Sequence, residues 1–321
     1  MVEERPFIAV VLEPGDDPPA PFDALTGEAE IRFVRADDGL AEAIERVDAL
    51  CVYDIHTRAI RENWRRAASL KWLHAASAGL DSVLFPESEA SDVIITNSRG
   101  VFDRPIAEFV LGAMLVFAKD ILTTLDLQRR GEWRHRESER LEGRSALIVG
   151  AGSIGRAIAG LLKCAGVAVS GIARHERAED PDFGRVHPSG RLREMLPDAD
   201  YVIISAPLTD ETRGMFGPEE FAAFKPGARL INIGRGPIVQ EEALIDALRS
   251  GHVAGAALDV FAEEPLPAEH PFWSMPNVIV SPHMSGDFCG WQEALAGLFI
   301  DNFRRWRKGG EMLNVVKAGP Q

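Results

Sequence analysis

A glycine-rich segment near the middle of the chain constrains the fold more than any other feature. The apolar run Ser145–Val149 leads into Gly150-Ala-Gly152-Ser-Ile-Gly155, and a helix-forming stretch follows at 156–164. In such a strand–turn–helix unit the first glycine permits a tight turn, the second lets the backbone approach a pyrophosphate, and the third allows close helix packing. The amino end of the helix adds amide donors and a positive dipole. The segment therefore predicts a dinucleotide-binding domain; a purely structural glycine turn is the alternative.

Short apolar runs recur along the chain in two series. The first series lies at 7–12, 31–34, 49–52, 72–75 and 93–96, and the second at 146–149, 167–172, 201–205, 230–233, 256–260 and 278–280. Runs of this length that alternate with helical segments predict βαβ units and parallel sheets. The 321 residues also exceed the roughly 250 to 300 at which a single core stops growing. We therefore expect an α/β protein with two Rossmann-like or flavodoxin-like parallel-sheet domains.

Two helices mark the predicted domain boundaries. Asp103-Arg-Pro105 precedes an apolar run at 109–118, and such an Asp caps a helix whose first turn tolerates Pro. After the last strand, aromatic and apolar residues recur at three- and four-residue steps from Phe288 to Trp306, which predicts an amphipathic helix. If this helix packs on the first domain, residues 1–102 and 286–321 form one discontinuous domain. Residues 103–285 then form a domain inserted within it.

Composition excludes several classes of function. The formal charge of −14 argues against a nucleic-acid partner, because proteins bind phosphate backbones through clustered Lys and Arg side chains. The longest apolar stretch, 109–118, is well short of the roughly 20 residues that cross a bilayer. Three distant cysteines, no metal-binding spacing and no secretory signal predict a cytoplasmic protein with reduced thiols and no metal site.

The end of the second strand of the dinucleotide unit indicates the form of the cofactor. NAD-binding domains place a carboxylate there for the adenosine ribose, whereas this chain has Ala173, followed by Arg174 and His175. A guanidinium can grip a ribose 2′-phosphate through two parallel hydrogen bonds. The pattern favours NADPH, with NAD as a second possibility, and a solvated basic loop is the alternative.

Three polar residues follow later strands of the same domain. Arg235 lies between two glycines, Glu264 lies in Asp259-Val-Phe-Ala-Glu-Glu-Pro265, and His283 lies in Ser281-Pro-His-Met-Ser-Gly286. Open α/β sheets bind their ligands at the carboxyl ends of the strands. Taken singly, each residue has a non-functional interpretation: Arg235 as a surface residue, Glu264 as a solvated residue and His283 as a capped loop residue.

In this order after the glycine turn, these residues resemble the D-isomer-specific 2-hydroxyacid dehydrogenase family, which includes glyoxylate, hydroxypyruvate and phosphoglycerate dehydrogenases. Segments 72–81, 96–100, 107–108 and 206–209 also match its pattern, so the resemblance covers nearly the whole chain. It implies a flavodoxin-like substrate domain, built from both chain ends, around a Rossmann domain. It also implies a homodimer.

The resemblance implies a role for each matching residue. His283 would be the acid/base, Glu264 its carboxylate partner, and Arg235 the group that binds the substrate carboxylate and polarises its carbonyl. The family glutamate directly precedes the proline and lies five residues after Asp259, which selects Glu264 over Glu263.

Further residues are implied as substrate and cofactor contacts. The backbone amides of Ala78 and Gly79 match the loop that holds the substrate carboxylate in the family. The implied cofactor contacts are Gly150, Gly152, Ser153, Ile154, Gly155, Arg174, His175, Pro207, Ile233, Asp259, His283 and Gly286.

The resulting prediction is an oxidoreductase that transfers a hydride from NADPH to a small 2-keto acid, such as glyoxylate or hydroxypyruvate, and yields the D-2-hydroxy acid. An NAD-dependent dehydrogenase of the phosphoglycerate type is the alternative. A more distant one is a dinucleotide-sensing binding protein, because a transcriptional corepressor family shares this fold. Which keto acid is used depends on pocket residues that spacing does not locate, among them His74, Leu80, Trp133, Phe288 and Trp291.

Overall fold

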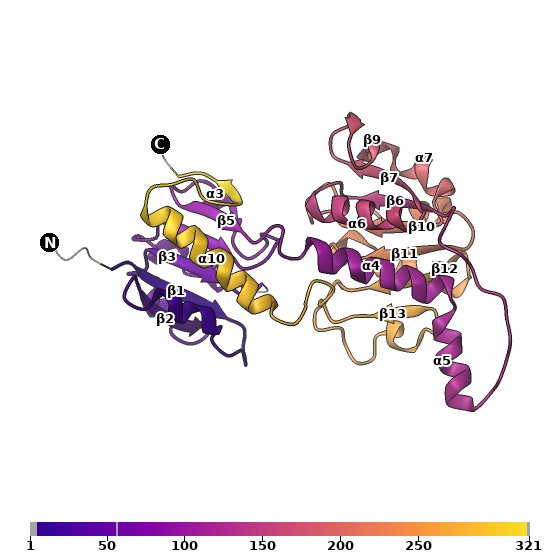
Figure 1. Ribbon diagram of the computed structural model, residues 1–321, viewed down its shortest axis with the longest axis horizontal. Helices are drawn as coiled ribbons and strands as arrows, with labels where there is room; N and C mark the ends of the chain where they lie inside the picture. The colour runs from indigo at the N-terminus through magenta and orange to yellow at the C-terminus, as the bar shows by residue number, and fades with distance from the viewer. Residues whose placement is uncertain (1–4, 56, 320–321) are drawn as a thin grey trace. The chain divides into compact units, whose positions relative to one another are not determined.

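The computed structural model describes residues 5–55 and 57–319, which form two compact units (Figure 1). The terminal unit comprises the chain up to Phe102 and from Phe288 onward, and the central unit comprises Asp103–Asp287. Each unit has one largely parallel sheet with helices on its faces, so the predicted α/β fold class is confirmed. Within the described ranges, no helix is both long enough and apolar enough to cross a membrane.

The terminal unit is built on a six-stranded sheet in the order β14-β5-β4-β3-β1-β2. Strands β1 to β5 are parallel, and β14 from the end of the chain pairs antiparallel with β5. The strands are β1 (Phe7–Leu12), β2 (Glu30–Arg35), β3 (Ala49–Val52), β4 (Trp72–Ala75), β5 (Ile94–Asn97) and β14 (Val315–Lys317). The helices are α1 (Leu40–Ala43), α2 (Ala59–Glu62), α3 (Pro86–Glu89) and α10 (Trp291–Arg307), with short 3-10 turns at η1 (Ala20–Leu25) and η2 (Trp64–Arg66).

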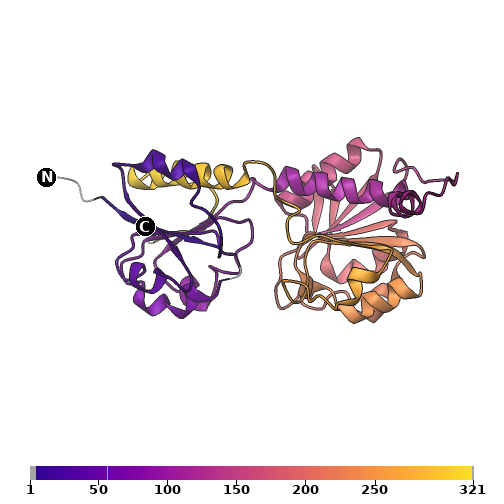
Figure 2. The ribbon, with the colours of Figure 1, turned by 90° about the horizontal axis from the view of Figure 1, so that it is seen from below.

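Both faces of this sheet are buried, because successive side chains of a strand point to opposite sides. Along β1, residues 7, 9 and 11 enter one apolar core and residues 8, 10 and 12 enter the other. Helix α10 covers the second face (Figure 2). There, Phe299 stacks on Trp72 with ring centroids 4.5 Å apart. The predicted aromatic C-terminal helix therefore docks on the N-terminal strands.

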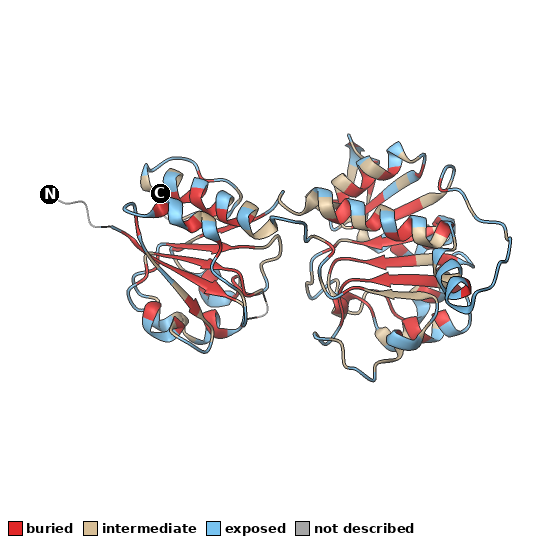
Figure 3. Ribbon diagram, turned by 60° about the horizontal axis from the view of Figure 1, so that its bottom comes forward, coloured by how far each residue is buried: buried red, intermediate tan, exposed pale blue. Residues whose placement is uncertain are grey.

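The central unit has an eight-stranded sheet in the order β13-β12-β11-β10-β6-β7-β9-β8, in which only β8 is antiparallel. Four of its strands, β6, β10, β11 and β12, lie buried between helices whose outer faces are exposed (Figure 3). The strands are β6 (Ser145–Val149), β7 (Ala168–Ala173), β8 (Arg177–Asp180), β9 (Gly184–Pro188), β10 (Tyr201–Ile204), β11 (Ala228–Asn232), β12 (Val253–Leu258) and β13 (Val278–Val280). The helices are α4 (Asp103–Ala118), α5 (Ile121–Arg130), α6 (Ser153–Cys164), α7 (Leu192–Met195), α8 (Pro218–Ala223) and α9 (Glu241–Arg249), with 3-10 turns at η3 (Ser189–Arg191), η4 (Leu196–Asp198), η5 (Gly236–Ile238) and η6 (Pro271–Ser274).

The hairpin β8–β9 has no counterpart among the strands expected from apolar patterning, because its segments are mostly polar. A buried carboxylate holds it in place. Asp180 accepts hydrogen bonds from both terminal nitrogens of Arg156, from Nε of Arg177, and from two backbone amides at 182–183. Burial opposes ionisation, but these donors hold the pKa of Asp180 well below its usual range.

Candidate active site

The glycine turn joins β6 to α6 in a conformation that most residues could not adopt. Gly150 has a φ of 112°, and a Cβ there would lie 2.5 Å from the backbone nitrogen of Ala206. A Cβ on Gly155 would lie 2.0 Å from the carbonyl oxygen of Gly150. Packing within the protein therefore requires the first and third glycines. A Cβ on Gly152 would meet no described atom within 4 Å, so protein packing does not account for the second.

Helix α6 begins directly after this turn, with Gly152 as its N-cap residue and Ser153 and Ile154 in its first turn. The first amides of any α-helix have no acceptor within the helix, and they carry its positive end. The predicted cofactor residues Gly150–Gly155 thus lie at the positive end of a 12-residue helix.

The basic residues after β7 lie at the surface. Arg174 pairs with Glu211 at 2.5 Å, and the two side chains are 59% and 66% exposed. Arg177, which was not among the predicted contacts, donates from Nη2 to the carbonyl oxygen of Ala151 in the glycine turn, at 3.0 Å. The sequence does place Arg177 three residues after Arg174, but only the hairpin β8–β9 brings it to the turn.

His283 and Glu264 form a close pair. The distance from Nδ1 of His283 to Oε2 of Glu264 is 2.8 Å, and the side chains are 25% and 17% exposed. The other carboxylate oxygen of Glu264 accepts the backbone N–H of Phe261 at 2.8 Å, which fixes the carboxylate in its loop. The structure brings Glu264, and not the neighbouring Glu263, to the imidazole.

Asp259 shapes the turn that carries His283. Its side chain, 1% exposed, accepts hydrogen bonds from the hydroxyl of Ser281 at 2.6 Å and from the amides of Met284 and Ser285 at 2.9 to 3.1 Å. The backbone N–H of His283 donates to the carbonyl of Asp259 at 2.9 Å. These bonds hold His283 at a φ of 53°, in the left-handed region. Local sequence contains no signal for this positioning role.

Arg235 follows β11, and its turn packs directly against the loop of Glu264. A Cβ on Gly236 would lie 1.8 Å from the carbonyl carbon of Phe261, so the two backbones touch. The half-buried Arg235 donates from Nη1 to the carbonyl of Gly234 at 2.7 Å. Arg235, Glu264 and His283 thus follow the neighbouring strands β11, β12 and β13, at the carboxyl edge of the sheet where the glycine turn also lies.

The remaining predicted contacts lie in loops. Pro207 is exposed after β10, Ile233 is buried after β11, and Gly286 is half-buried after β13. In the terminal unit, Ala78 and Gly79 are half-buried in the loop after β4. Their backbone N–H groups contact no acceptor in the part of the chain that the structure describes.

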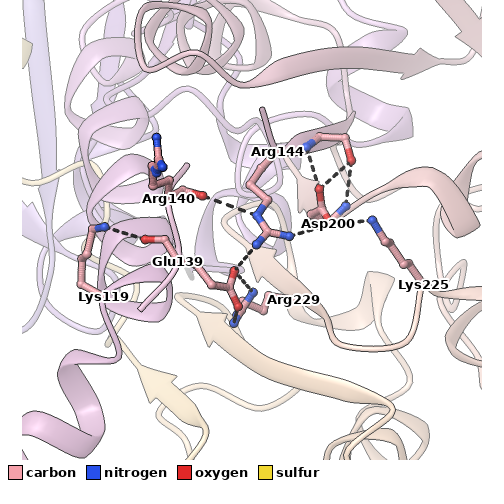
Figure 4. Close-up of polar contacts among 8 residues, drawn as sticks. Lys119, Glu139, Arg140, Arg144, Asp200, Lys225 and Arg229 are labelled. Carbon is pink, nitrogen blue, oxygen red and sulfur yellow. Dashed lines mark hydrogen bonds and ion pairs between the residues drawn. The ribbon is translucent and has the colours of Figure 1, made fainter. Parts of the chain in front are cut away.

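A second polar cluster lies at the opposite, amino edge of the central sheet (Figure 4). Glu139 accepts from both terminal nitrogens of Arg229 at 2.9 and 3.2 Å and pairs with Arg144 at 3.3 Å. Asp200 pairs with Lys225 at 2.8 Å and with Arg144 at 3.7 Å. Because both acids are paired with Arg or Lys side chains, this cluster anchors the irregular segment between α5 and β6.

Comparisons with known proteins agree with this geometry. Residues 111–285, more than half of the chain, match the family described as D-isomer specific 2-hydroxyacid dehydrogenase, NAD binding domain. A glyoxylate reductase of Thermococcus onnurineus is 34% identical over 298 residues, covering 87% of this chain and 88% of the relative. A D-3-phosphoglycerate dehydrogenase of Methanocaldococcus jannaschii is 29% identical over 90% of this chain, which spans only 55% of that relative's length.

A solved structure is similar over both units. The NADPH-dependent glyoxylate/hydroxypyruvate reductase of Sinorhizobium meliloti, in complex with NADP and malonate, is 29% identical, with a TM-score of 0.84 and coverage of 99% of both chains. With the matching NAD-binding domain and the curated relatives, this likeness establishes the family. The chain belongs to the D-isomer specific 2-hydroxyacid dehydrogenases, oxidoreductases that depend on NAD or NADP.

Proposed function

We propose that this protein transfers a hydride from NADPH to a small 2-keto acid of the glyoxylate or hydroxypyruvate kind and yields the D-2-hydroxy acid. The observation that carries this proposal is the 2.8 Å pair of His283 and Glu264, which lies with Arg235 at the sheet edge of the glycine turn. The open side of Gly152 and the first amides of α6 fit a pyrophosphate.

Apart from the hydride, the proposed reaction needs only residues of this protein. The residues of the glycine turn would hold NADPH, which would supply the hydride for C2 of the keto acid. As negative charge builds on the carbonyl oxygen, protonated His283 donates a proton to it as general acid. Glu264 engages Nδ1 of the imidazole, so Nε2 is the nitrogen that exchanges this proton. Arg235 binds the substrate carboxylate and stabilises the developing charge.

The preference for NADPH is supported by the end of β7. Ala173 offers no carboxylate to repel a 2′-phosphate, and Arg174 follows it. The partner of Arg174, Glu211, does not prevent this role, because ion pairs between exposed side chains contribute only about 0 to 1 kcal/mol. A doubly charged phosphate can therefore replace the carboxylate.

Substitution of this arginine tests the preference. We expect Arg174→Ala to weaken NADPH binding by roughly tenfold or more and NADH binding by less than about twofold, since only NADPH carries the 2′-phosphate. Dissociation constants from the fluorescence of the bound nicotinamide measure both. Arg193→Ala is the matched control, because Arg193 is 56% exposed and also pairs with a glutamate, Glu219. Equal losses for both cofactors would dismiss the phosphate clamp.

A panel of 2-keto acids tests the activity itself. We expect NADPH absorbance to fall when glyoxylate or hydroxypyruvate is added, and chiral analysis to identify the D product. Rapid NAD reduction by a 2-hydroxy acid such as 3-phosphoglycerate, with no keto acid reduced by NADPH, would favour the alternative that the Methanocaldococcus relative suggests. Dinucleotide binding without turnover of any acid would favour a dinucleotide-sensing protein.

We also propose that two copies of this chain associate through the central unit, as the family resemblance implies. The support is a set of exposed apolar side chains on α4, α5 and the segment after α5: Leu115, Ile121, Leu125 and Trp133, at 41%, 37%, 41% and 101% exposure. Exposed apolar surface of this kind commonly marks a protein interface.

A further inference from the structure

The two adjacent amides in the loop after β4 are held in a fixed direction by residues at the end of β5. The backbone N–H of Ser98 donates to the carbonyl of Ser77 at 2.9 Å, and Nδ2 of Asn97 donates to the carbonyl of Ala78 at 2.8 Å. In a trans peptide the C=O and the following N–H point in opposite directions. These two bonds therefore direct the N–H groups of Ala78 and Gly79 away from β5.

Two further contacts complete this arrangement. The hydroxyl of Ser77 donates to the carbonyl of Gly79 at 2.8 Å. The backbone N–H of Arg99 donates to Oδ1 of Asn97 at 3.3 Å, which turns the Asn97 amide so that its Nδ2 faces Ala78. The carbonyl groups that would repel an anion are thereby engaged by donors, while the two N–H groups between them contact no acceptor among the described residues.

A buried hydrogen-bond chain lies beneath this loop, and its direction follows from the chemistry of its members. The indole Nε1 of Trp72 can only donate, so Thr96 Oγ1 accepts from it at 2.8 Å. At the other end, the single hydroxyl proton of Ser98 goes to the carbonyl of Ala75 at 3.1 Å, so Ser98 Oγ accepts from Nε2 of His74, also at 3.1 Å. In a neutral ring Nδ1 is then the acceptor, and Thr96 Oγ1 donates to it at 2.7 Å.

This hydrogen-bond chain requires a neutral imidazole at His74. The side chains of Trp72, His74, Thr96 and Ser98 are fully buried. Burial lowers the pKa of His74 to about 3, so the ring carries no charge at neutral pH. A neutral histidine with an accepting Nδ1 and a donating Nε2 can therefore hold Ser98 in one orientation, and the backbone of Ser98 is the donor that directs the first of the two amides.

We propose that Asn97 and His74 are positioning residues for the substrate carboxylate. Asn97 sets the direction of the Gly79 amide, and His74 acts through Ser98 on the Ala78 amide. Neither residue touches the substrate. The inference rests on the proposed function, in which these amides bind the carboxylate. Donors that are oriented before binding need no reorganisation when the anion arrives, which favours affinity.

Asn97→Ala tests the first half. We expect the KM for glyoxylate and the Kd for oxamate to rise about tenfold or more, because a donor to the anion is lost when the peptide can turn. Oxamate carries a carboxylate beside an amide carbonyl that accepts no hydride, so its binding to the NADPH-loaded protein, measured by calorimetry, is independent of turnover. The Kd for NADPH should stay within about twofold of the wild-type value.

Asn63→Ala is the matched control for this variant. Asn63 lies in the same unit, and its Nδ2 donates to the carbonyl of Ala59 at 2.9 Å, so the same kind of bond is removed outside the loop. We expect Asn63→Ala to leave the KM for glyoxylate and the affinity for oxamate unchanged. Equal effects of the two substitutions would reduce Asn97 to a structural role.

His74→Leu and His74→Gln test the second half. Leucine breaks the chain, whereas glutamine offers one acceptor and one donor and should restore most of the oxamate affinity. Cys51→Ala controls for lost packing, because Cys51 is fully buried and lies opposite His74 on β3. Two results would overturn the inference: full oxamate affinity in Asn97→Ala, or a loss in His74→Gln as large as in His74→Leu. If the wild type neither binds oxamate nor reduces a keto acid, the proposed function itself is wrong.

Discussion

At the scale of single residues, His283, the proposed general acid, adopts an unfavourable backbone conformation. A left-handed conformation costs a residue with a side chain about 1 to 2 kcal/mol. Asp259 offsets this cost, because its buried carboxylate accepts the amides of the two residues that follow His283. Glu264 holds the ring at Nδ1. The orientation of the imidazole therefore depends on two acids from the loops around it.

Loss of the imidazole should separate catalysis from cofactor binding. We expect His283→Ala to lower kcat by roughly 100-fold or more, the usual contribution of a positioned general acid. NADPH binding, measured by fluorescence, should change little because the glycine turn is untouched. If the variant keeps most of its kcat, the acid/base role belongs to another residue.

The buried His74 makes stability depend on pH. Its pKa in the folded protein, about 3, lies below the ordinary 6.5, so the unfolded chain takes up this proton first as the pH falls. The contribution of the neutral ring is complete near pH 7 and is lost progressively as the pH falls from about 6.5 toward 3. Between about pH 7 and pH 5, we expect the wild type to lose about 2 kcal/mol more of its free energy of unfolding than His74→Gln.

Denaturant titrations at the two pH values measure this difference. Cys51→Ala, which leaves His74 in place, should keep the pH dependence of the wild type. Parallel pH profiles for the wild type and His74→Gln would show that the imidazole does not titrate differently in the folded and unfolded chains.

At the scale of elements, the unit β6–turn–α6 depends on contact between backbones. A Cβ on Gly155 would lie 2.0 Å from the Gly150 carbonyl, and a Cβ on Gly150 would lie 2.5 Å from Ala206. The turn therefore lies too close to the start of α6 and to the segment after β10 to leave room for a side chain at either glycine. The same crowding links the turns after β11 and β12, where Gly236 lies against Phe261.

Two glycines of α6 allow a matched test. We expect Gly155→Ala to weaken NADPH binding by more than about tenfold, because the added Cβ must push α6 away from the glycine turn. The first amides of the helix are then displaced from the proposed pyrophosphate site. Gly160 lies further along the same helix, and a Cβ there would meet nothing within 4 Å. We therefore expect Gly160→Ala to stabilise the protein by about 0.5 to 1 kcal/mol. Thermal unfolding and NADPH titration of both variants measure these effects, and NADPH binding unchanged in Gly155→Ala would contradict the packing argument.

At the scale of the whole molecule, each unit has its own buried sheet, and the chain crosses between the units near residues 102 and 288. The terminal unit is completed only by the last segment of the chain, because α10 and β14 cover and extend the sheet of the first hundred residues. Folding of that unit therefore requires contacts between the two ends of the sequence.

The proposed association of two copies is also a property of the whole molecule. We expect sedimentation to give a species of twice the chain mass, and Leu125→Glu on α5 to shift it toward the monomer, because a charge would be buried in the interface. Leu313→Glu is the control, since Leu313 is similarly exposed, at 38% against 41%, but lies in the terminal unit. A monomeric wild type would reject the proposal.

The sequence by itself determined the α/β class, the glycine turn and most strands of both sheets. These features depend on local patterns: alternating or continuous apolar runs and glycines at fixed spacing. The aromatic periodicity of 288–306 also predicted α10.

Only the tertiary structure decided the partners of polar side chains, because hydrogen bonds and charge pairs join residues far apart in the chain. It formed the hairpin β8–β9 around Asp180, where no apolar pattern existed, and it paired Arg174 with Glu211. It also corrected the expectation that His74 lines the substrate pocket. The His74 side chain is wholly buried, between the hydroxyl groups of Thr96 and Ser98. A strand pattern reports which face a side chain occupies, whereas its partner depends on the neighbouring strand and its register.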